Sequence, residues 1–222
     1  MDIILLIGLF MASYLLGSVN FGIILSASRK VDIKSEGSGN SGATNMLRTF
    51  GAKIGLLTLL LDLLKGVIPA LVGYFAFGGS ADLSSSYIGL YVCGLASVIG
   101  HIFPIYYKFK GGKAAATSCG VFLVAQPVVA LIAFVLCVGL AMVTKYVSLM
   151  SLLFVLINVV WQCLFLPEFV FLENFNFIVM ILAIIMGLLV FLAHRENIAR
   201  LLCGKEKKTD VFGLLVSKLK KK

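Results

Sequence analysis

Residues 37–45 form a polar, glycine-rich stretch, Gly-Ser-Gly-Asn-Ser-Gly-Ala-Thr-Asn, and Arg48 follows it. Glycine lets a backbone turn tightly and present its N–H groups to a ligand. A helix that begins near Gly42 would also point its N-terminus, which favours anions, at that ligand. Further donors come from Ser38, Asn40, Thr44 and Asn45, and Arg48 supplies a fixed cation. The stretch predicts a phosphate cradle. A flexible linker is the alternative, but it explains the Asn, Thr and Arg residues poorly.

Two nucleotide-binding motifs are excluded by their surroundings. Gly37, Gly39 and Gly42 fit the pattern G-x-G-x-x-G, but a dinucleotide site needs a preceding strand, and the neighbouring segments here are long and apolar. Gly112 and Lys113 are followed by Ala114 rather than the Ser or Thr that binds magnesium in a phosphate-binding loop of the Walker type.

A second polar cluster comprises Gly-His-Ile-Phe-Pro at residues 100–104, Lys-Phe-Lys-Gly-Gly-Lys at residues 108–113, and Thr117. Gly111 and Gly112 are predicted to let the chain approach a ligand closely. Lys113 would open a short helix, where a cation opposes the helix dipole, so a bound anion would explain its position. The alternatives are that the two earlier lysines only mark the membrane topology and that His101 is an ordinary interfacial residue.

A third cluster lies at residues 194–200, His-Arg-Glu-Asn-Ile-Ala-Arg. On a helix His194 and Asn197 share a face because they are three residues apart, whereas Arg195 points elsewhere. A basic anchor at the end of the last membrane helix is a serious alternative. Three such clusters, separated by long apolar segments, are nevertheless predicted to converge on one side of a membrane, and each offers donors to an anion.

The composition indicates the kind of molecule that must position these clusters. The chain has 222 residues, of which 60% are hydrophobic and only 13% charged, with a net charge of +9. A soluble domain has about 25% charged residues, so a soluble enzyme, a disordered chain and a disulfide-stapled module are excluded. The five cysteines form no C-x-x-C pair, and neither a disulfide framework nor a metal site is expected. No Lys or Arg precedes Arg29, so the first apolar segment is predicted to be a mature helix rather than a signal peptide.

Apolar segments and basic residues together predict seven membrane helices. Single helices are expected over residues 3–27, 54–77, 86–102, 147–166 and 174–193, and two over 114–143, breaking near Gln126-Pro127. Basic residues lie in 28–53 and 103–113, at Lys145 and in the C-terminal tail, whereas 78–85 and 167–173 have none. Because cytoplasmic loops are rich in Lys and Arg, seven helices place every basic cluster in the cytoplasm, with the N-terminus outside and the C-terminus inside. The helix 114–125 would rise about 18 Å, too little to cross about 30 Å of hydrocarbon.

The chain is predicted to form one membrane domain, residues 1–205, followed by a basic cytoplasmic tail, residues 206–222. The tail is either solvated or a short helix that lies on anionic lipid. Asp62 and Lys65, one turn apart in an apolar helix, are expected to form an internal ion pair.

Three ordered motifs resemble those of the bacterial integral-membrane acyl-phosphate:glycerol-3-phosphate acyltransferases. They are Gly-Ser-Gly-Asn-x-Gly-Ala-Thr-Asn-x-x-Arg, Gly-His-x-Phe-Pro…Phe-Lys-Gly-Gly-Lys and His-Arg-x-Asn-Ile-x-Arg-Leu. The resemblance covers nearly the whole chain and includes Leu61-Asp62-x-x-Lys65-Gly66. Each motif alone would be weak, but the three in order are specific.

The resemblance implies transfer of an acyl group from an acyl phosphate to the 1-hydroxyl of glycerol 3-phosphate, which yields lysophosphatidic acid and phosphate. It also implies seven helices in a cell membrane and an active site on the cytoplasmic face. By motif, the catalytic positions are Ser38, Arg48, His101, Lys113 and Asn197. The substrate phosphate sites would be completed by Gly37, Gly39, Asn40, Thr44, Asn45, Gly111, Gly112, Thr117 and His194.

Two positions depart from the family pattern. The family usually has Gly after Gly-Gly-Lys, where this chain has Ala114, and Pro where this chain has Asn20. Alanine loses left-handed backbone freedom. A helical position tolerates alanine, however, so activity is expected to survive.

The general base is not decided by the sequence. Neither histidine is followed by the acid of a His-x-x-x-x-Asp pair, because Tyr106 and Ala199 occupy those positions. One hypothesis is that a substrate phosphate oxygen takes the hydroxyl proton while His101 binds or orients; another makes His101 the base. A covalent acyl intermediate on Ser38 is rated low, because no base adjoins it in sequence.

The competing class of function is a membrane transporter of a phosphorylated metabolite. It shares the fold type and anion-binding loops, but it predicts an internal repeat that the sequence lacks. We expect the two substrates and membrane lipid as partners, with no cofactor, metal, nucleic acid or obligate protein partner.

Overall fold

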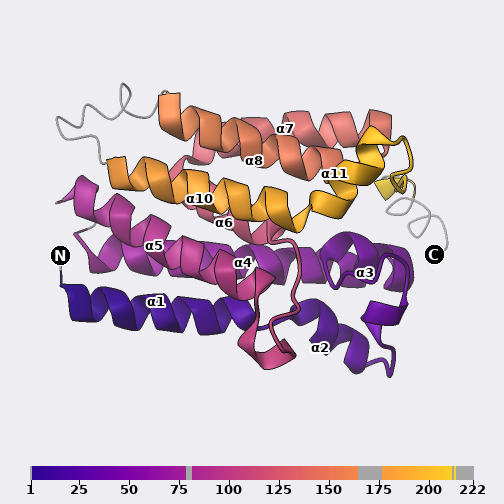
Figure 1. The fold of residues 1–222 in the computed structure, drawn as a ribbon, viewed down its shortest axis with the longest axis horizontal. Coiled ribbons are helices and arrows are strands. Elements are labelled where there is room, and N and C mark those ends of the chain that lie inside the picture. Colours follow the sequence, from indigo (N-terminus) through magenta and orange to yellow (C-terminus); the bar gives the residue numbers. More distant parts are fainter. Residues whose placement is uncertain (1, 79–81, 165–176, 212, 214–222) are drawn as a thin grey trace.

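The chain folds into one elongated bundle of helices. The structure is a computed structural model, which describes residues 2–78, 82–164, 177–211 and 213. Across these residues it contains α-helices and short 3-10 helices and no strand. Figure 1 shows the long helices side by side, with the start of α1 and the helix α11 at opposite ends of the bundle. The predicted all-helical class is confirmed.

The long helices of the bundle are α1 (Ile3–Ser18), α4 (Ala52–Ala76), α5 (Leu83–Ile102), α7 (Pro127–Thr144), α8 (Val147–Leu164) and α10 (Phe177–Ala193). The shorter ones are α2 (Phe21–Ala27), α3 (Ala43–Phe50), α6 (Ala115–Ala125) and α11 (Arg195–Leu202), with 3-10 turns η1 (Ile33–Ser35) and η2 (Ile105–Tyr107).

Among the described residues, five helical units are long and apolar enough to cross a membrane. They are Ile3–Ala27, Ala52–Ala76, Leu83–Tyr107, Pro127–Thr144 and Val147–Leu164, and a sixth arises if α10 and α11, bent by 62°, count as one span. α6, with 11 residues, is too short by itself. The seven crossings and the outside N-terminus therefore stay predictions.

The predicted break within 114–143 is confirmed. α6 ends at Ala125, and Pro127 begins α7, where its missing N–H costs no hydrogen bond. Gln126 between them is buried, and its Nε2 donates to the carbonyl oxygen and to Oδ1 of Asn158, both at 2.9 Å. This contact fastens the end of the short helix to α8.

The apolar segment predicted over 3–27 is found with the same bounds, Ile3–Ala27, but it is broken into α1 and α2 rather than being a single helix. Val19 and Asn20 are extended, and Asn20 begins a new helix by accepting a hydrogen bond from the backbone N–H of Ile23 at 3.1 Å. Its Nδ2 donates to Oγ of Ser41 at 2.8 Å. Asn20, which replaces the proline usual in the family, thus connects the α1–α2 break to the glycine-rich stretch. Its amide oxygen caps α2, and its amide N–H group donates to Ser41.

Ala114 was expected to occupy a helical position, but it lies just before α6 instead. Its φ is +56° and its ψ is +16°, which is the left-handed region, and it precedes the first residue of α6. Left-handed backbone costs an L-residue about 1–2 kcal/mol. Alanine is therefore tolerated here at a cost, and the preference of the family for glycine has a physical reason.

α5 lies at the centre of the fold and packs against α1, α4, α6 and α10. Close approach depends on glycines: a Cβ on Gly73 of α4 would overlap the carbonyl oxygen of Gly89 of α5, and one on Gly89 would overlap that of Gly73. In the same way Gly66 of α4 lies against Thr117 of α6. In a lipid bilayer the hydrophobic effect does not drive helices together, so close van der Waals packing of this kind stabilises their association. They make α4, α5 and α6 the frame of the site.

Candidate active site

The glycine-rich stretch is shaped by Asn45, which projects into it from α3. Nδ2 of Asn45 donates to the carbonyl oxygen of Glu36, and Oδ1 accepts from the backbone N–H of Ser38, each at 2.9 Å. Gly37 and Gly39 have φ values of +59° and +70°, and a Cβ on Gly37 would overlap Oδ1 of Asn45. The glycines therefore allow the loop to wrap around a buried amide.

The other polar side chains of this stretch differ in what they offer a ligand. Oδ1 of Asn40 accepts from the backbone N–H of Gly42 at 2.9 Å, so it closes the turn that precedes α3. Ser38 is exposed, and Thr44 is half-buried in the first turn of α3. α3 begins directly after Gly42, as expected. Asn40 and Asn45 thus build the loop, whereas Ser38 and Thr44 lie on its accessible side.

Gly111 and Gly112 approach α5 closely. The N–H of Gly111 donates to the carbonyl oxygen of Ile102 at 3.1 Å, and that of Gly112 to the carbonyl oxygen of His101 at 3.0 Å. A Cβ on Gly111 would overlap the same His101 oxygen, and one on Gly112 would overlap Nε2 of the ring. Their N–H groups therefore close the C-terminal end of α5 rather than stand free, and they fix the point from which Lys113 projects.

His101 belongs to a buried polar cluster on the frame. Its Nδ1 lies 3.3 Å from Oγ1 of Thr117 on α6 and 3.8 Å from Oδ1 of Asp62 on α4. The predicted ion pair is confirmed, because Nζ of Lys65 lies 3.0 Å from that same Asp62 oxygen. A carboxylate from a different helix thus lies near His101, although beyond hydrogen-bond distance, and spacing along the chain could not reveal it.

Lys113 joins the second cluster to the third. Its ammonium donates to Oδ1 of Asn197, on α11. The ring of His194 lies at the bend between α10 and α11, where Nδ1 donates to the carbonyl oxygen of Val190 at 2.8 Å. That bond leaves Nε2 as the acceptor of the neutral ring. The bend therefore turns Asn197 toward the α5–α6 loop.

The first cluster is joined to the third by residues Lys205–Asp210, which we call the strap. Nε of Arg48 donates to Oγ1 of Thr209 at 2.8 Å, Nη2 contacts the same oxygen, and Nη2 also donates to the carbonyl oxygen of Lys207 at 3.1 Å. Nζ of Lys207 donates to the carbonyl oxygen of Gly37 at 2.8 Å. The strap is fixed at its far end by Lys145, whose carbonyl oxygen accepts from the Thr209 N–H.

The boundary predicted between the membrane domain and the tail at residue 206 stays a prediction. Residues 206–210, which it assigns to the tail, contact the first and third clusters, and Thr209 is buried. The alternation of apolar and basic residues over 210–222 lies almost wholly outside the described residues.

The cations of the three clusters repel one another. Burial lowers the pKa of Lys113 below its ordinary value, and the charges of Arg200 and Arg48 lower it further. Glu206 and Glu196 act in the opposite direction but offset only part of this effect. Burial likewise lowers the pKa of Arg48, which stays charged because its ordinary value is above 12. The arrangement is suited to an anion with several negative charges.

Four residues of this arrangement, Glu206, Ser148, Thr209 and Arg200, were not among the predicted site residues, although Arg200 belongs to the third cluster. Glu206 accepts hydrogen bonds from Asn197 and Arg200, Ser148 of α8 donates to Glu206, and Thr209 binds Arg48. The only sequence feature that could have indicated Glu206 is that it is a carboxylate within a run of lysines. No sequence feature indicated Ser148 or Thr209. Within the described part of the chain, no three His, Cys, Asp or Glu side chains gather as metal ligands.

The comparisons with known proteins all match proteins described as glycerol-3-phosphate acyltransferases. Residues 7–204 match the family model described as glycerol-3-phosphate acyltransferase. A relative of that name from Aquifex aeolicus is 42% identical over 194 residues, covering 87% of this chain and 94% of the relative. One from Finegoldia magna is 41% identical over 209 residues, covering 94% of this chain and 98% of the relative.

Two crystal structures of PlsY (YgiH), an integral membrane glycerol 3-phosphate acyltransferase, match with TM-scores of 0.80 and 0.78. They represent the glycerol 3-phosphate and the lysophosphatidic acid forms. Each is 38% identical and covers 95% of this chain and 98% of its own.

Proposed function

Because the chain belongs to the glycerol-3-phosphate acyltransferase family, we propose that it transfers an acyl group from an acyl phosphate to the 1-hydroxyl of glycerol 3-phosphate. The products are 1-acylglycerol 3-phosphate, which is lysophosphatidic acid, and inorganic phosphate. Membership of this family favours the enzyme over the transporter. The reaction is the first step of phospholipid synthesis, and we place it on the cytoplasmic face of a cell membrane.

The observation that carries this proposal is that three cations are held by one connected set of hydrogen bonds. Lys113 donates to Asn197, and Asn197 and Arg200 both donate to Glu206 of the strap. Arg48 donates to Thr209 of the same strap. Glycerol 3-phosphate and acyl phosphate each bring a phosphate group, so both need cations and N–H donors. Arginine suits bidentate phosphate binding, and lysine supplies a point charge. α4, which packs against the helix α3 that carries Arg48, exposes Leu56, Leu57 and Leu60, and this apolar surface suits the acyl chain.

This reaction depends more on positive charge placed near the reacting groups than on a strong general acid. The 1-hydroxyl oxygen attacks the carbonyl carbon, a tetrahedral oxyanion forms, and the carbon–oxygen bond to phosphate breaks. Lys113 and Asn197 supply N–H donors near the reacting groups, where donors aimed at the oxyanion lower the barrier. The hydroxyl proton passes to a phosphate oxygen of the substrate, and phosphate leaves without protonation by the protein because it is already a good leaving group.

The neighbours of His101 support this assignment of the proton. Nδ1 faces Thr117 and Asp62, and Nε2 lies against the backbone of Gly112. A base must lie within hydrogen-bond reach of the proton that it takes, and both ring nitrogens here face the protein. We assign His101 the role of holding the α5–α6 loop.

A panel of acyl donors tests the proposal. Purified protein in detergent is given radiolabelled glycerol 3-phosphate with palmitoyl phosphate, palmitoyl coenzyme A or palmitoyl-acyl carrier protein, and label in the lipid phase is counted. We expect incorporation with palmitoyl phosphate alone. Incorporation only with a thioester donor, or with none in protein that is folded, would overturn the assignment of the donor.

A further inference from the structure

Glu206 lies at the centre of the cation cluster. Its side chain is 6% exposed. Oε1 accepts from Nδ2 of Asn197 at 2.6 Å and from Oγ of Ser148 at 3.0 Å, and Oε2 accepts from Nε of Arg200 at 2.7 Å. The donors come from α11 and α8, while Glu206 itself belongs to the strap. One carboxylate therefore holds the strap against α11, which precedes it in the chain, and against α8, where Ser148 lies 58 residues away in sequence.

The two neighbours of Asn197 determine which way its amide faces. The ammonium of Lys113 can only donate, so it contacts Oδ1, and the ionised carboxylate of Glu206 can only accept, so it contacts Nδ2. An amide between two groups without such a preference can turn over, because its two ends have nearly the same shape. Glu206 thus selects one orientation, and that orientation fixes the ammonium of Lys113.

We propose that Glu206 is a positioning residue for acyl transfer, which holds the Asn197 amide and, through it, the Lys113 ammonium in their reactive places. The inference rests on the proposed function. Three of about four acceptor sites on the carboxylate are filled, so Glu206 holds its neighbours rather than takes a proton. It also supplies the negative charge that keeps Lys113 and Arg200 together before a phosphate arrives.

The charges around Lys113 give this role a measurable signature. The groups that face it are Arg48 from α3, His194 from the α10–α11 bend, Arg200 and Glu196 from α11, and Glu206 from the strap. Removing a negative charge lowers the pKa of a neighbouring ammonium, because the charged form loses stabilisation. Since phosphate binding needs the ammonium, activity falls as the pH rises through the Lys113 pKa. Loss of the Glu206 charge therefore moves this alkaline fall to lower pH.

The pKa of Glu206 itself agrees with a permanently ionised group. Burial opposes ionisation, but hydrogen bonds from Arg200, Asn197 and Ser148 outweigh it and lower the pKa below the ordinary value for a glutamate. The carboxylate is therefore ionised throughout the pH range in which Lys113 titrates.

The experiment compares Glu206→Gln, Glu206→Asp and the matched control Glu196→Gln with the unaltered protein. Glu196 lies on α11 and also contacts Arg200, at 3.9 Å, but its side chain is 73% exposed. For each protein, kcat and KM for glycerol 3-phosphate and palmitoyl phosphate are measured from pH 6 to 10, and folding is checked by gel filtration and thermal unfolding in detergent.

We expect Glu206→Gln to lower kcat about tenfold to a hundredfold, as misplacement of a binding group does, and to move the alkaline fall to lower pH. Glu206→Asp keeps the charge but shortens the side chain, so kcat drops while the alkaline fall stays in place. Glu196→Gln also removes a negative charge near Lys113 but no hydrogen bond to Asn197, so its kcat should stay within about threefold of the unaltered protein, and its alkaline fall should move less than that of Glu206→Gln.

A Glu206→Gln protein with unchanged kcat and an unchanged alkaline fall would overturn the inference. If that variant does not fold, Glu206→Asp decides, and a kcat equal to that of the unaltered protein would overturn it. An unaltered protein without activity toward palmitoyl phosphate would instead overturn the proposed function, so the two failures are distinguishable.

Discussion

His101 shows how a residue that matches a catalytic motif can act through the frame. It is buried on α5, its Nδ1 faces α4 and α6, and Gly112 packs on Nε2. The family motif predicts its place in the site, but the direction of its nitrogens needs the contacts between helices. Asp62 and Lys65 are in the same cluster, so the ion pair expected to brace the bundle also adjoins the candidate site.

Replacement of His101 by alanine separates a base from a holding residue. We expect His101→Ala to lose about tenfold in kcat/KM, rather than the 10²–10⁴-fold typical of a lost general base. The pH profile of kcat/KM should keep its acidic limb, because the proton acceptor is a substrate phosphate. Disappearance of that limb together with the larger loss would make His101 the base.

Ala114 offers a direct measure of backbone strain beside Lys113. Its φ of +56° disfavours any side chain and disfavours a β-branched one most. We expect Ala114→Gly to keep full activity, because glycine is free in this region, and Ala114→Val to lower the free energy of unfolding by about 2 kcal/mol or more. The check is thermal unfolding and turnover of both variants in detergent. Equal midpoints for the two would show that the left-handed conformation does not restrict position 114.

Some helices and breaks could be predicted from the sequence, and others could not. Gln126-Pro127 marked a break because proline removes a hydrogen bond inside a span that was too long. The break at Asn20 was missed because one asparagine hardly changes the apolar character of residues 3–27, and its effect depends on Ser41. The three polar clusters were predictable from residue types, but their joining through the strap depends on contacts over more than 150 residues of sequence.

In the proposed reaction, the strap competes with a substrate phosphate for Arg48. Thr209 occupies Nε and Nη2, the edge of the guanidinium that suits bidentate binding. Thr209→Val removes a partner that Arg48 has only before phosphate binds, so we expect KM for one or both substrates to fall by about threefold to tenfold, as one hydrogen bond implies. The measurement is KM for each substrate with kcat as the control. A rise in KM would show that Thr209 also contributes to the substrate-bound state.

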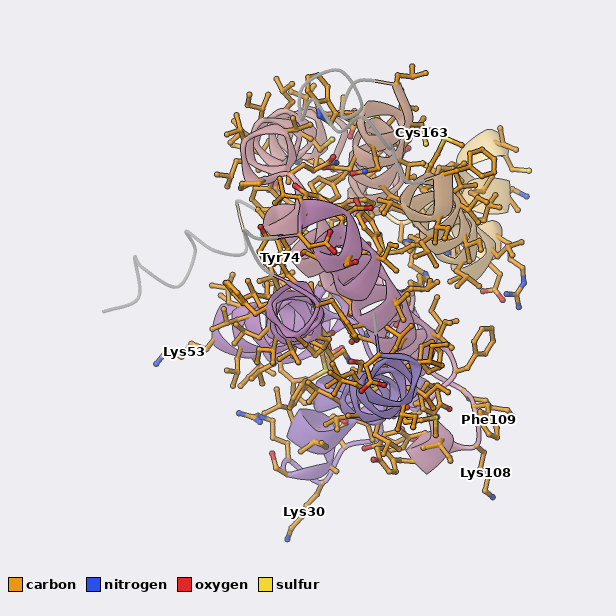
Figure 2. All side chains as sticks on the ribbon, turned by 90° about the vertical axis from the view of Figure 1, so that its left-hand side faces the viewer. Lys30, Lys53, Tyr74, Lys108, Phe109 and Cys163 are labelled. Carbon is orange, nitrogen blue, oxygen red and sulfur yellow. The ribbon has the colours of Figure 1, made fainter. Side chains whose placement is uncertain are left out.

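The distribution of basic residues determines how the whole molecule is expected to sit in a membrane. Figure 2 shows Lys30, Lys53 and Lys108 extending away from the bundle, where they can meet lipid headgroups. Lys113, by contrast, turns inward to Asn197. We therefore expect lysine to serve topology in one place and ligand binding in another, and the sequence pattern alone does not separate the two.

The orientation can be tested with a natural cysteine. Cys203, at the end of α11, is exposed, whereas Cys93, Cys119 and Cys137 are buried. In a Cys163→Ser background, a membrane-impermeant maleimide should label Cys203 in inside-out vesicles and not in right-side-out ones, because the basic C-terminal region is predicted to be cytoplasmic. Labelling only in right-side-out vesicles would reverse the predicted topology.

The most direct measurement is the stoichiometry of products formed by the purified protein from palmitoyl phosphate and glycerol 3-phosphate. Mass spectrometry of the lipid and a phosphate assay are run on the same samples, with Lys113→Met as the control. We predict equal amounts of lysophosphatidic acid and phosphate, and a loss of about a hundredfold or more in the control, as for a lost transition-state donor. Phosphate release without acylated product, or full turnover by Lys113→Met, would contradict an acyltransferase centred on these clusters.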